Sequence, residues 1–267
     1  MPKFKSRFER LELKYLVDES MAQRIRQDIK AYCEVDPHNN VLSGDFGRAP
    51  GYPIRSCYLD SPSLAFHAAK ERGDPDRLKL RIRTYSSTSP ASLEIKRRRS
   101  AVIDKTRVMV ERNRVEEAIA GEFMGSAMGG RESSILSDFA LLAARFGARP
   151  TLRVGYWREA FESQVDTYAR VTFDRRITVA ENSRWSREPR KEAWSSFNEY
   201  WRSHGIHNPV VLELKCEMVP PVWMIDLIRK YDLRQTSFSK YSIGVGLCRL
   251  NGGLGQSHSA RSLKALR

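Results

Sequence analysis

The stretch RLKLRIRTY at residues 77–85 decides the fold that we expect for this chain. Four cations alternate there with three apolar residues, in the order Arg77, Leu78, Lys79, Leu80, Arg81, Ile82 and Arg83. Because successive side chains leave a strand on opposite faces, this period of two predicts a strand with one apolar and one cationic face. Cations in a row along one face repel each other, so the array is costly unless anions lie near it.

The composition favours a polyanionic partner. The chain has 267 residues, with 46 Lys and Arg against 32 Asp and Glu, and a formal charge of +14. This length permits one large all-β or α+β domain, or two small ones. A balance this basic suits nucleic acid, an anionic membrane or phosphate-rich small molecules, and charge alone does not choose among them.

The cysteines and the N-terminal segment indicate the compartment. Cys33, Cys57, Cys216 and Cys248 are far apart and form no CxxC pair, so we expect reduced, buried thiols and no zinc site. The N-terminus carries no apolar segment of the signal-peptide kind, and no apolar run is long enough to span a bilayer. We therefore expect a cytoplasmic protein without a transmembrane segment. The sequence does not indicate an oligomeric state.

The rest of the chain predicts strands interrupted by helices. Strands are expected at residues 8–17, 54–59, 77–85, 93–96, 103–110, 151–161, 168–178 and 210–219. Helices are expected at 19–33, 63–72, 114–146 with a break at Gly129 and Gly130, and 221–231, with Asp18 capping the first. Residues 37–53 read as a loop, and 181–207 as an irregular excursion. We expect one domain over residues 8–250 and a flexible tail over 251–267.

Several predicted strands share the alternation of the opening stretch. Glu12 and Lys14, Glu94 and Lys96, Arg170 and Asp174, and Glu213 and Lys215 each alternate with apolar residues. An open antiparallel sheet with one solvated face would also give this pattern. However, the amphipathic helices need an apolar surface, and the apolar faces of the strands would supply it. The charged faces would then line the interior of a closed sheet, which needs a bound polyanion and a metal ion to neutralise it.

Nine ordered motifs resemble one known family. They are ELKYLV at 12–17, RSCYLDSP at 55–62, KLRIRTY at 79–85, LEIKRR at 93–98, IDKTR at 103–107, YWREAF at 156–161, RVTFD at 170–174, LELK at 212–215 and FSKYSIG at 238–244. On these motifs the chain resembles the VTC-type polyphosphate polymerase domain of the CYTH, or triphosphate tunnel metalloenzyme, superfamily. The resemblance covers nearly the whole chain.

The resemblance implies an α+β fold, in which eight antiparallel strands close into a tunnel and helices pack on the outside. It also implies catalytic residues that bind the phosphoryl groups of the substrate, namely Lys14, Arg81, Arg83, Lys96, Arg158, Arg170 and Lys240. Lys105 would be a further basic residue along the phosphate path. Tyr156 would be a hydroxyl donor in the tunnel.

The same resemblance implies Mn²⁺ or Mg²⁺ as the cofactor, with Glu213 as the carboxylate that holds it. The ExExK motif of the superfamily is only partly present, because Arg10 takes the place of the first Glu in RLELK at 10–14. This departure weakens the case for Glu12 as a metal ligand, so Glu12 is a weaker candidate than Glu213. This departure fits the polymerase branch better than the hydrolase branch.

The expected activity is transfer of the ATP γ-phosphoryl group onto a growing inorganic polyphosphate chain. With water as the acceptor, the same site would be an inorganic or nucleoside triphosphatase. A third possibility is a non-catalytic protein that binds polyanions such as nucleic acid through its basic surface. The glutamates between the best-ordered cations would repel a nucleic-acid backbone, so we expect ATP and inorganic polyphosphate as partners and no specific nucleic acid.

Overall fold

The computed structural model describes residues 10–40, 50–86, 88–100, 102–122, 129–202, 206, 208–250, 252 and 254. Most of the predicted tail at 251–267, most of the predicted loop at 37–53 and the first two residues of the strand predicted at 8–17 lie outside these residues. The chain divides into two compact units. Unit 1 comprises Met1–Pro53, Tyr156–Ile177 and Phe197–Phe238, and unit 2 comprises Ile54–Gly155, Thr178–Ser196 and Ser239–Arg267.

Unit 1 is built on antiparallel strands. They are β1 (Arg10–Val17), β2 (Cys33–Val35), β10 (Val210–Glu217), and the parts of β7 (Arg149–Ser163) and β8 (Ala169–Glu181) that belong to this unit. β1 pairs with β10, β10 with β8, and β2 with β7. Its helices are α1 (Glu19–Asp28), α5 (Phe197–Arg202) and α6 (Val222–Lys230), with short 3₁₀ turns η1 (Ile29–Ala31) and η2 (Pro37–Asn40).

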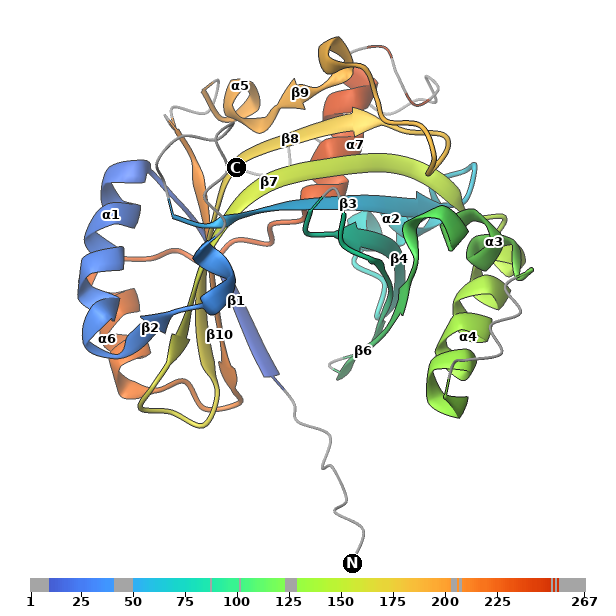
Figure 1. Ribbon diagram of the computed structural model, residues 1–267. Coiled ribbons are helices and arrows are strands. Elements are labelled where there is room, and N and C mark those ends of the chain that lie inside the picture. Colours follow the sequence, from blue (N-terminus) through green and yellow to red (C-terminus); the bar gives the residue numbers. More distant parts are fainter. Residues whose placement is uncertain are drawn as a thin grey trace, which may run out of the picture. The chain divides into compact units, whose positions relative to one another are not determined.

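Helices α1 and α6 lie side by side against the apolar face of the unit 1 strands (Figure 1). Leu13 and Tyr15 of β1 and Leu214 of β10 pack in one core with Ile25 of α1 and Met224 of α6. Helix α1 begins where the sequence predicts, because the Asp18 carboxylate accepts a hydrogen bond from the Met21 N–H at 2.7 Å. The charged residues that alternate with this core leave the strands on the face away from these helices.

Unit 2 contains a four-stranded antiparallel meander. It consists of β3 (Tyr52–Asp60), β4 (Asp76–Thr84), β5 (Ala91–Arg99) and β6 (Val102–Val110). Its helices are α2 (Ala65–Arg72), α3 (Val115–Ala120), α4 (Gly130–Phe146) and α7 (Lys240–Leu250). Two 3₁₀ turns, η3 (Arg112–Arg114) and η4 (Lys191–Ala193), and the two-residue strand β9 (Ser195–Ser196) complete it.

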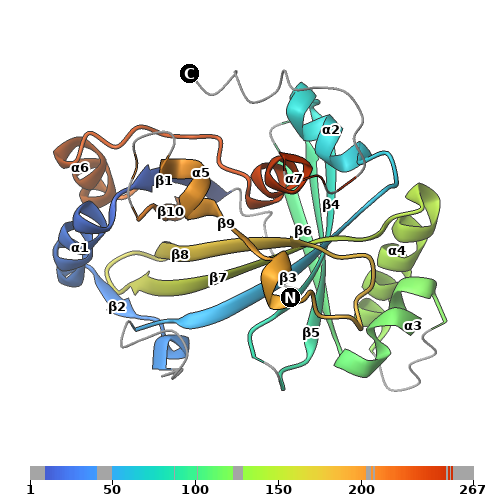
Figure 2. The same ribbon diagram turned by 90° about the horizontal axis from the view of Figure 1, so that it is seen from above.

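Helices α3 and α4 cover the apolar face of this meander (Figure 2). Leu80 and Ile82 of β4 are fully buried there together with Leu93 of β5 and Phe139 of α4. The opening stretch is therefore a strand, as predicted. Its cations lie on the face that α3 and α4 do not cover.

The strands are hydrogen-bonded in the order β1-β10-β8-β7-β3-β4-β5-β6, with β2 added beside β7 and β9 beside β8. This confirms the predicted antiparallel α+β class. β1 and β6 stand at the two ends of this order, and no strand pairing joins them within the described residues. Closure of eight strands into a tunnel, and the single domain over 8–250, stay predictions.

Three local predictions need correction. The helix predicted to reach Cys33 ends at Asp28, and Cys33 instead begins β2, paired with the end of β7. The strand predicted at 93–96 extends over 91–99 because it pairs along its whole length with β6. The excursion at 181–207 contains η4, β9 and α5, and Trp185 is buried in the unit 2 core.

Four buried, free cysteines match the predicted thiols. Within the residues that the structure describes, no helix is long and apolar enough to cross a membrane.

Candidate functional site

The charged face of unit 1 begins with two strands whose charges alternate in sign. Lys14 of β1 lies directly opposite Glu213 of β10, and Glu12 lies directly opposite Lys215. Residues directly opposite each other in an antiparallel pair share one face, so these four side chains form a checkerboard. Each carboxylate has a cation as its cross-strand neighbour.

Glu213 is the buried centre of this checkerboard, with 6% of its surface exposed. Lys14 Nζ lies 3.6 Å from Oε1, while Arg158 Nη2 and Lys215 Nζ each lie 3.5 Å from Oε2. Burial lowers the pKa of Lys215, and the nearby Arg158 lowers it further although Glu213 acts in the other direction. Three strands thus place cations around one carboxylate.

Arg158 of β7 is held by a second carboxylate, which sequence reasoning did not assign. Its Nε donates to Asp174 Oδ1 at 2.7 Å and its Nη2 to Oδ2 at 2.8 Å, so the fork is bidentate. Burial alone would lower the pKa of Arg158, but Asp174 outweighs it and the pKa is raised. The guanidinium carbon lies 5.4 Å from the ring centroid of Tyr156, which is itself buried.

Arg170 of β8 is also held by an acid that the sequence did not single out. Its Nη2 contacts Asp36, which lies just after β2, and donates to the Tyr52 hydroxyl at 3.3 Å. Burial alone would raise the pKa of Asp36, but hydrogen bonds from His38 and the charge of Arg170 outweigh it and lower the pKa. Arg170 Nε is buried and has no hydrogen-bond partner, while Nη1 lies 3.6 Å from Glu162 Oε1.

The charged face of unit 2 is organised around Glu94 of β5, which is 2% exposed. Its Oε2 accepts a hydrogen bond from Arg81 Nε at 3.1 Å, also contacts Arg81 Nη2, and lies 3.1 Å from Lys105 Nζ. Burial alone would raise the pKa of Glu94, but Arg81, Arg83 and Lys105 outweigh it and hold the pKa far below its usual range. Glu94 is therefore an anion at neutral pH, and its Oε1 is buried without a hydrogen-bond partner.

Two groups on this face have a pKa close to neutrality. Burial lowers the pKa of Lys105 to about 8, with Arg81 and Arg83 adding to the effect. Burial would raise the pKa of Tyr58, but the charges of Arg81, Lys79 and Arg83 outweigh it and lower the pKa to about 8. The Tyr58 hydroxyl accepts from Arg81 Nη1 at 3.4 Å. Sequence reasoning missed Tyr58, although it lies in the RSCYLDSP motif.

The remaining predicted cations of unit 2 lie on the same face or at its border. Lys96 stands between Lys79 and Lys105 in one row across three strands. Arg83 is buried and donates from Nε to Ser56 Oγ at 3.3 Å. Lys240 is the first residue of α7 and follows Ser239, whose hydroxyl accepts from Lys79 Nζ at 3.4 Å.

The predicted site residues therefore fall into two sets. Unit 1 carries Glu12, Lys14, Tyr156, Arg158, Arg170 and Glu213, and unit 2 carries Arg81, Arg83, Lys96, Lys105 and Lys240. Within each unit the strand register brings most of them onto one face. Their roles in binding and catalysis stay predictions.

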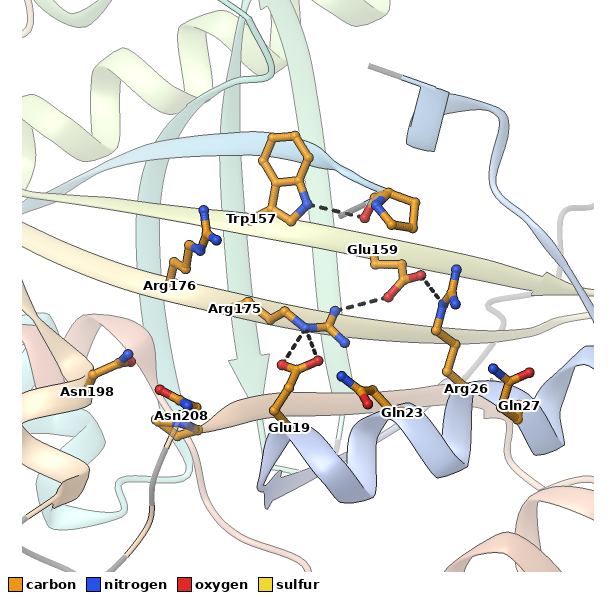
Figure 3. A pocket seen from close by; sticks show the side chains of 12 residues that line it. Glu19, Gln23, Arg26, Gln27, Trp157, Glu159, Arg175, Arg176, Asn198 and Asn208 are labelled. Atoms are coloured by element: carbon orange, nitrogen blue, oxygen red, sulfur yellow. Dashed lines mark hydrogen bonds and ion pairs between the residues drawn. The ribbon is translucent and has the colours of Figure 1, made fainter. Parts of the chain in front are cut away.

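A separate hollow of about 700 Å³ lies on the other face of unit 1 (Figure 3). Glu159 is buried at its centre, with Arg26 Nε 2.5 Å from one carboxylate oxygen and Arg175 Nη1 3.0 Å from the other. Arg175 Nε also donates to Glu19, at 2.8 Å to Oε2. None of the predicted site residues lines this hollow, and glutamates already engage both of its central guanidinium groups.

The described residues could hold a metal ion only together with the substrate. In the described part of the chain, no three His, Cys, Asp or Glu side chains gather into a group that could hold a metal ion. Magnesium is commonly bound by one or two carboxylates together with substrate phosphates. Glu213, with Glu12 on the same face, fits that arrangement.

Comparison with known proteins supplies the family. The family model of the VTC domain matches residues 9–249. This chain belongs to the VTC domain family. The match spans all the predicted site residues, and it agrees with the resemblance found from the motifs. No curated protein sequence matches this VTC domain.

Three solved structures match this VTC domain over most of its length with little sequence identity. A candidate adenylate cyclase from Bacillus halodurans has a TM-score of 0.46 and 11% identity, with 86% of this chain and 95% of that chain covered. A protein from Pyrococcus horikoshii OT3 has a TM-score of 0.44 and 12% identity, with 89% and 99% covered. A candidate adenylate cyclase from Vibrio parahaemolyticus has a TM-score of 0.43 and 11% identity, with 90% and 98% covered.

Proposed function

We propose that this VTC domain is a metal-dependent polyphosphate polymerase, which transfers the γ-phosphoryl group of ATP onto the end of an inorganic polyphosphate chain. The observation that carries the proposal is that cations on both charged faces are fixed by buried carboxylates. Glu94 holds Arg81, and Asp174 holds Arg158. Preorganised cations of this kind stabilise the charge of a transferring phosphoryl group without reorganising during the reaction.

Phosphoryl transfer requires little covalent chemistry from the protein. The terminal phosphate oxygen of the polymer attacks the γ-phosphorus of ATP, the bond from that phosphorus to the β–γ bridging oxygen breaks, and ADP leaves. The attack needs no general base, because a terminal phosphate already carries an ionised oxygen at neutral pH. On the charged face of unit 2, Arg81 and Arg83 would neutralise phosphoryl groups of the substrate. On the charged face of unit 1, Arg158 would do the same.

The metal would be held by Glu213 and by phosphate oxygens of the substrate. A bound Mn²⁺ or Mg²⁺ supplies charge neutralisation on the phosphate oxygens. Lys14 and Lys215 fix the position of the Glu213 carboxylate, and Asp174 keeps Arg158 in place beside it.

The test is to identify the product. Purified protein is incubated with ATP and Mn²⁺, and ADP, free phosphate and polymer are quantified separately. We expect ADP together with polyphosphate. Free phosphate without polymer would instead identify a triphosphatase. ATP that binds without being consumed would indicate a non-catalytic polyanion-binding protein.

A further inference from the structure

The charged face of unit 2 continues beyond the residues assigned to phosphoryl transfer. Arg77 of β4 and Arg98 of β5 lie directly opposite each other, one step further along the strands than Lys79 and Lys96. Side chains on one face of a strand are two residues apart, about 6.6 to 6.8 Å. The cations therefore form rows at regular intervals.

Three successive rows cross the meander. They are Arg81, Glu94 and Arg107, then Lys79, Lys96 and Lys105, then Arg77, Arg98 and Ile103. The first row includes the buried Glu94, whereas in the next two rows each pair directly opposite across β4 and β5 is cationic. Like charges directly opposite each other are destabilising, so these rows are expected to gain stability from a bound anion.

Along β4 and β5 the side chains of this face become more exposed in the same direction, while Arg107, Lys105 and Ile103 of β6 are all exposed. Glu94 and Arg83 are buried, Lys79, Lys96 and Arg77 are half-buried, and Arg98 is exposed. Burial lowers the pKa of Arg77, and the neighbouring Arg98 lowers it further. Arg98 Nε donates to the carbonyl of Ser100 at 2.7 Å, which ties this guanidinium to the β5–β6 turn. The cationic face thus runs from a buried end to an exposed one.

We propose that Arg77 and Arg98 bind the growing polyphosphate chain outside the transfer residues, and that the polymer leaves along β4 and β5 toward the β5–β6 turn. This inference rests on the proposed polymerase function. A repeating polyanion matches cations at a regular interval. A nucleotide would also present a base and a ribose, and these two rows contain only Lys, Arg and Ile103.

The test compares two double variants that remove equal charge. The first is Arg77→Gln with Arg98→Gln. The control is Arg97→Gln with Arg99→Gln, whose side chains leave β5 on the opposite face, where Arg97 lies beside Leu78 and Asp104. At equal amounts of ATP consumed, we expect the first variant to release polymer several-fold shorter than the parent's. The control should match the parent.

A binding measurement without ATP makes the outcome independent of turnover. We expect the Arg77/Arg98 variant to bind long-chain inorganic polyphosphate about tenfold more weakly than the control, with equal affinity for inorganic triphosphate. Equal polyphosphate affinity in the two variants would overturn the inference. A parallel loss of triphosphate affinity would also overturn it, because the two arginines would then belong to the transfer site. If the parent makes no polymer, the polymerase proposal fails and this binding comparison still decides the inference.

Discussion

Glu94 lies directly opposite Arg81 across β4 and β5, and its buried Oε2 accepts a hydrogen bond from Arg81 Nε at 3.1 Å. Lys105 Nζ lies 3.1 Å from the same oxygen. One carboxylate therefore neutralises part of a cationic face and fixes two of its side chains.

Replacing Glu94 by Gln should destabilise unit 2 and make its stability depend on bound anion. Removing one partner of a buried ion pair leaves uncompensated charge and costs roughly 3 to 5 kcal/mol. We expect the free energy of unfolding, measured with urea, to fall by about 3 kcal/mol. Inorganic triphosphate should restore more stability to Glu94→Gln than to the parent.

The exposed Asp104→Asn on β6 is the matched control, because Asp104 lies opposite Arg97 on the other face. Its unfolding free energy should change by less than about 0.5 kcal/mol. Equal stabilisation of Glu94→Gln and the parent by triphosphate would argue against anion binding at this face.

Lys105 and Tyr58 predict a loss of anion affinity as the pH rises above about 8. The pKa of each group is lowered to about 8, so at higher pH the ammonium loses its positive charge and the phenol gains a negative one. We expect the affinity for inorganic triphosphate, measured by calorimetry, to fall roughly tenfold between about pH 7 and about pH 9. Lys105→Arg with Tyr58→Phe should remove most of this dependence, since arginine stays charged.

The same two groups predict the opposite trend for stability. Their ordinary pKa values are 10.5 and 10.0, so between about pH 8 and about pH 10 the unfolded chain binds more protons than the folded chain. The stability contributed by these groups therefore rises with pH across that window. As the pH increases, the free energy of unfolding of the parent, measured with urea, should rise relative to that of the double variant. A difference that stays constant would contradict the assigned pKa shifts.

Arg158 should be more important for folding than Arg170. Arg158 is buried and makes a bidentate pair with Asp174, whereas the Arg170 side chain is 29% exposed. Arg158→Ala would remove the bidentate guanidinium partner of the buried Asp174, and breaking a buried ion pair costs about 3 to 5 kcal/mol. We expect Arg170→Ala to cost less than half as much in the same urea titration. Equal losses of unfolding free energy in the two variants would show that the contact between Arg158 and Asp174 does not stabilise the fold.

Glu213 should be needed for turnover and not for binding. Glu213→Ala is expected to consume ATP at least about 100-fold more slowly, because the metal loses its protein ligand. Binding of inorganic triphosphate in excess chelator should be retained. Glu217→Gln, on the same face of β10 and opposite Arg10, is the control and should keep its activity. Unchanged turnover in Glu213→Ala would exclude Glu213 as the metal ligand.

The alternation of residue types predicted which face each cation occupies, because strand faces follow directly from a period of two. It could not predict which carboxylate each cation meets. Asp174 engages Arg158 from the neighbouring strand and Asp36 engages Arg170 from a connection 134 residues away, so both contacts depend on tertiary packing. Glu94 was visible on the charged face, but only the strand register places it beside both Arg81 and Lys105.

Short elements were missed for a similar reason. β2 and β9 have three and two residues, too few to show a period, and they exist because β7 and β8 offer hydrogen-bonding edges. Trp185 was placed in an irregular excursion, yet its indole donates to the Arg112 carbonyl and its ring packs in the unit 2 core. Nothing in the local sequence specifies that partner.

The most direct measurement is the fate of the γ-phosphoryl group of ATP. ATP labelled at the γ-phosphate is incubated with the purified protein and Mn²⁺, and the label is followed into polymer and into free phosphate. We expect ADP release to be matched by label in a lengthening polyphosphate chain. Label that appears only as free phosphate, or that stays in ATP, would contradict it.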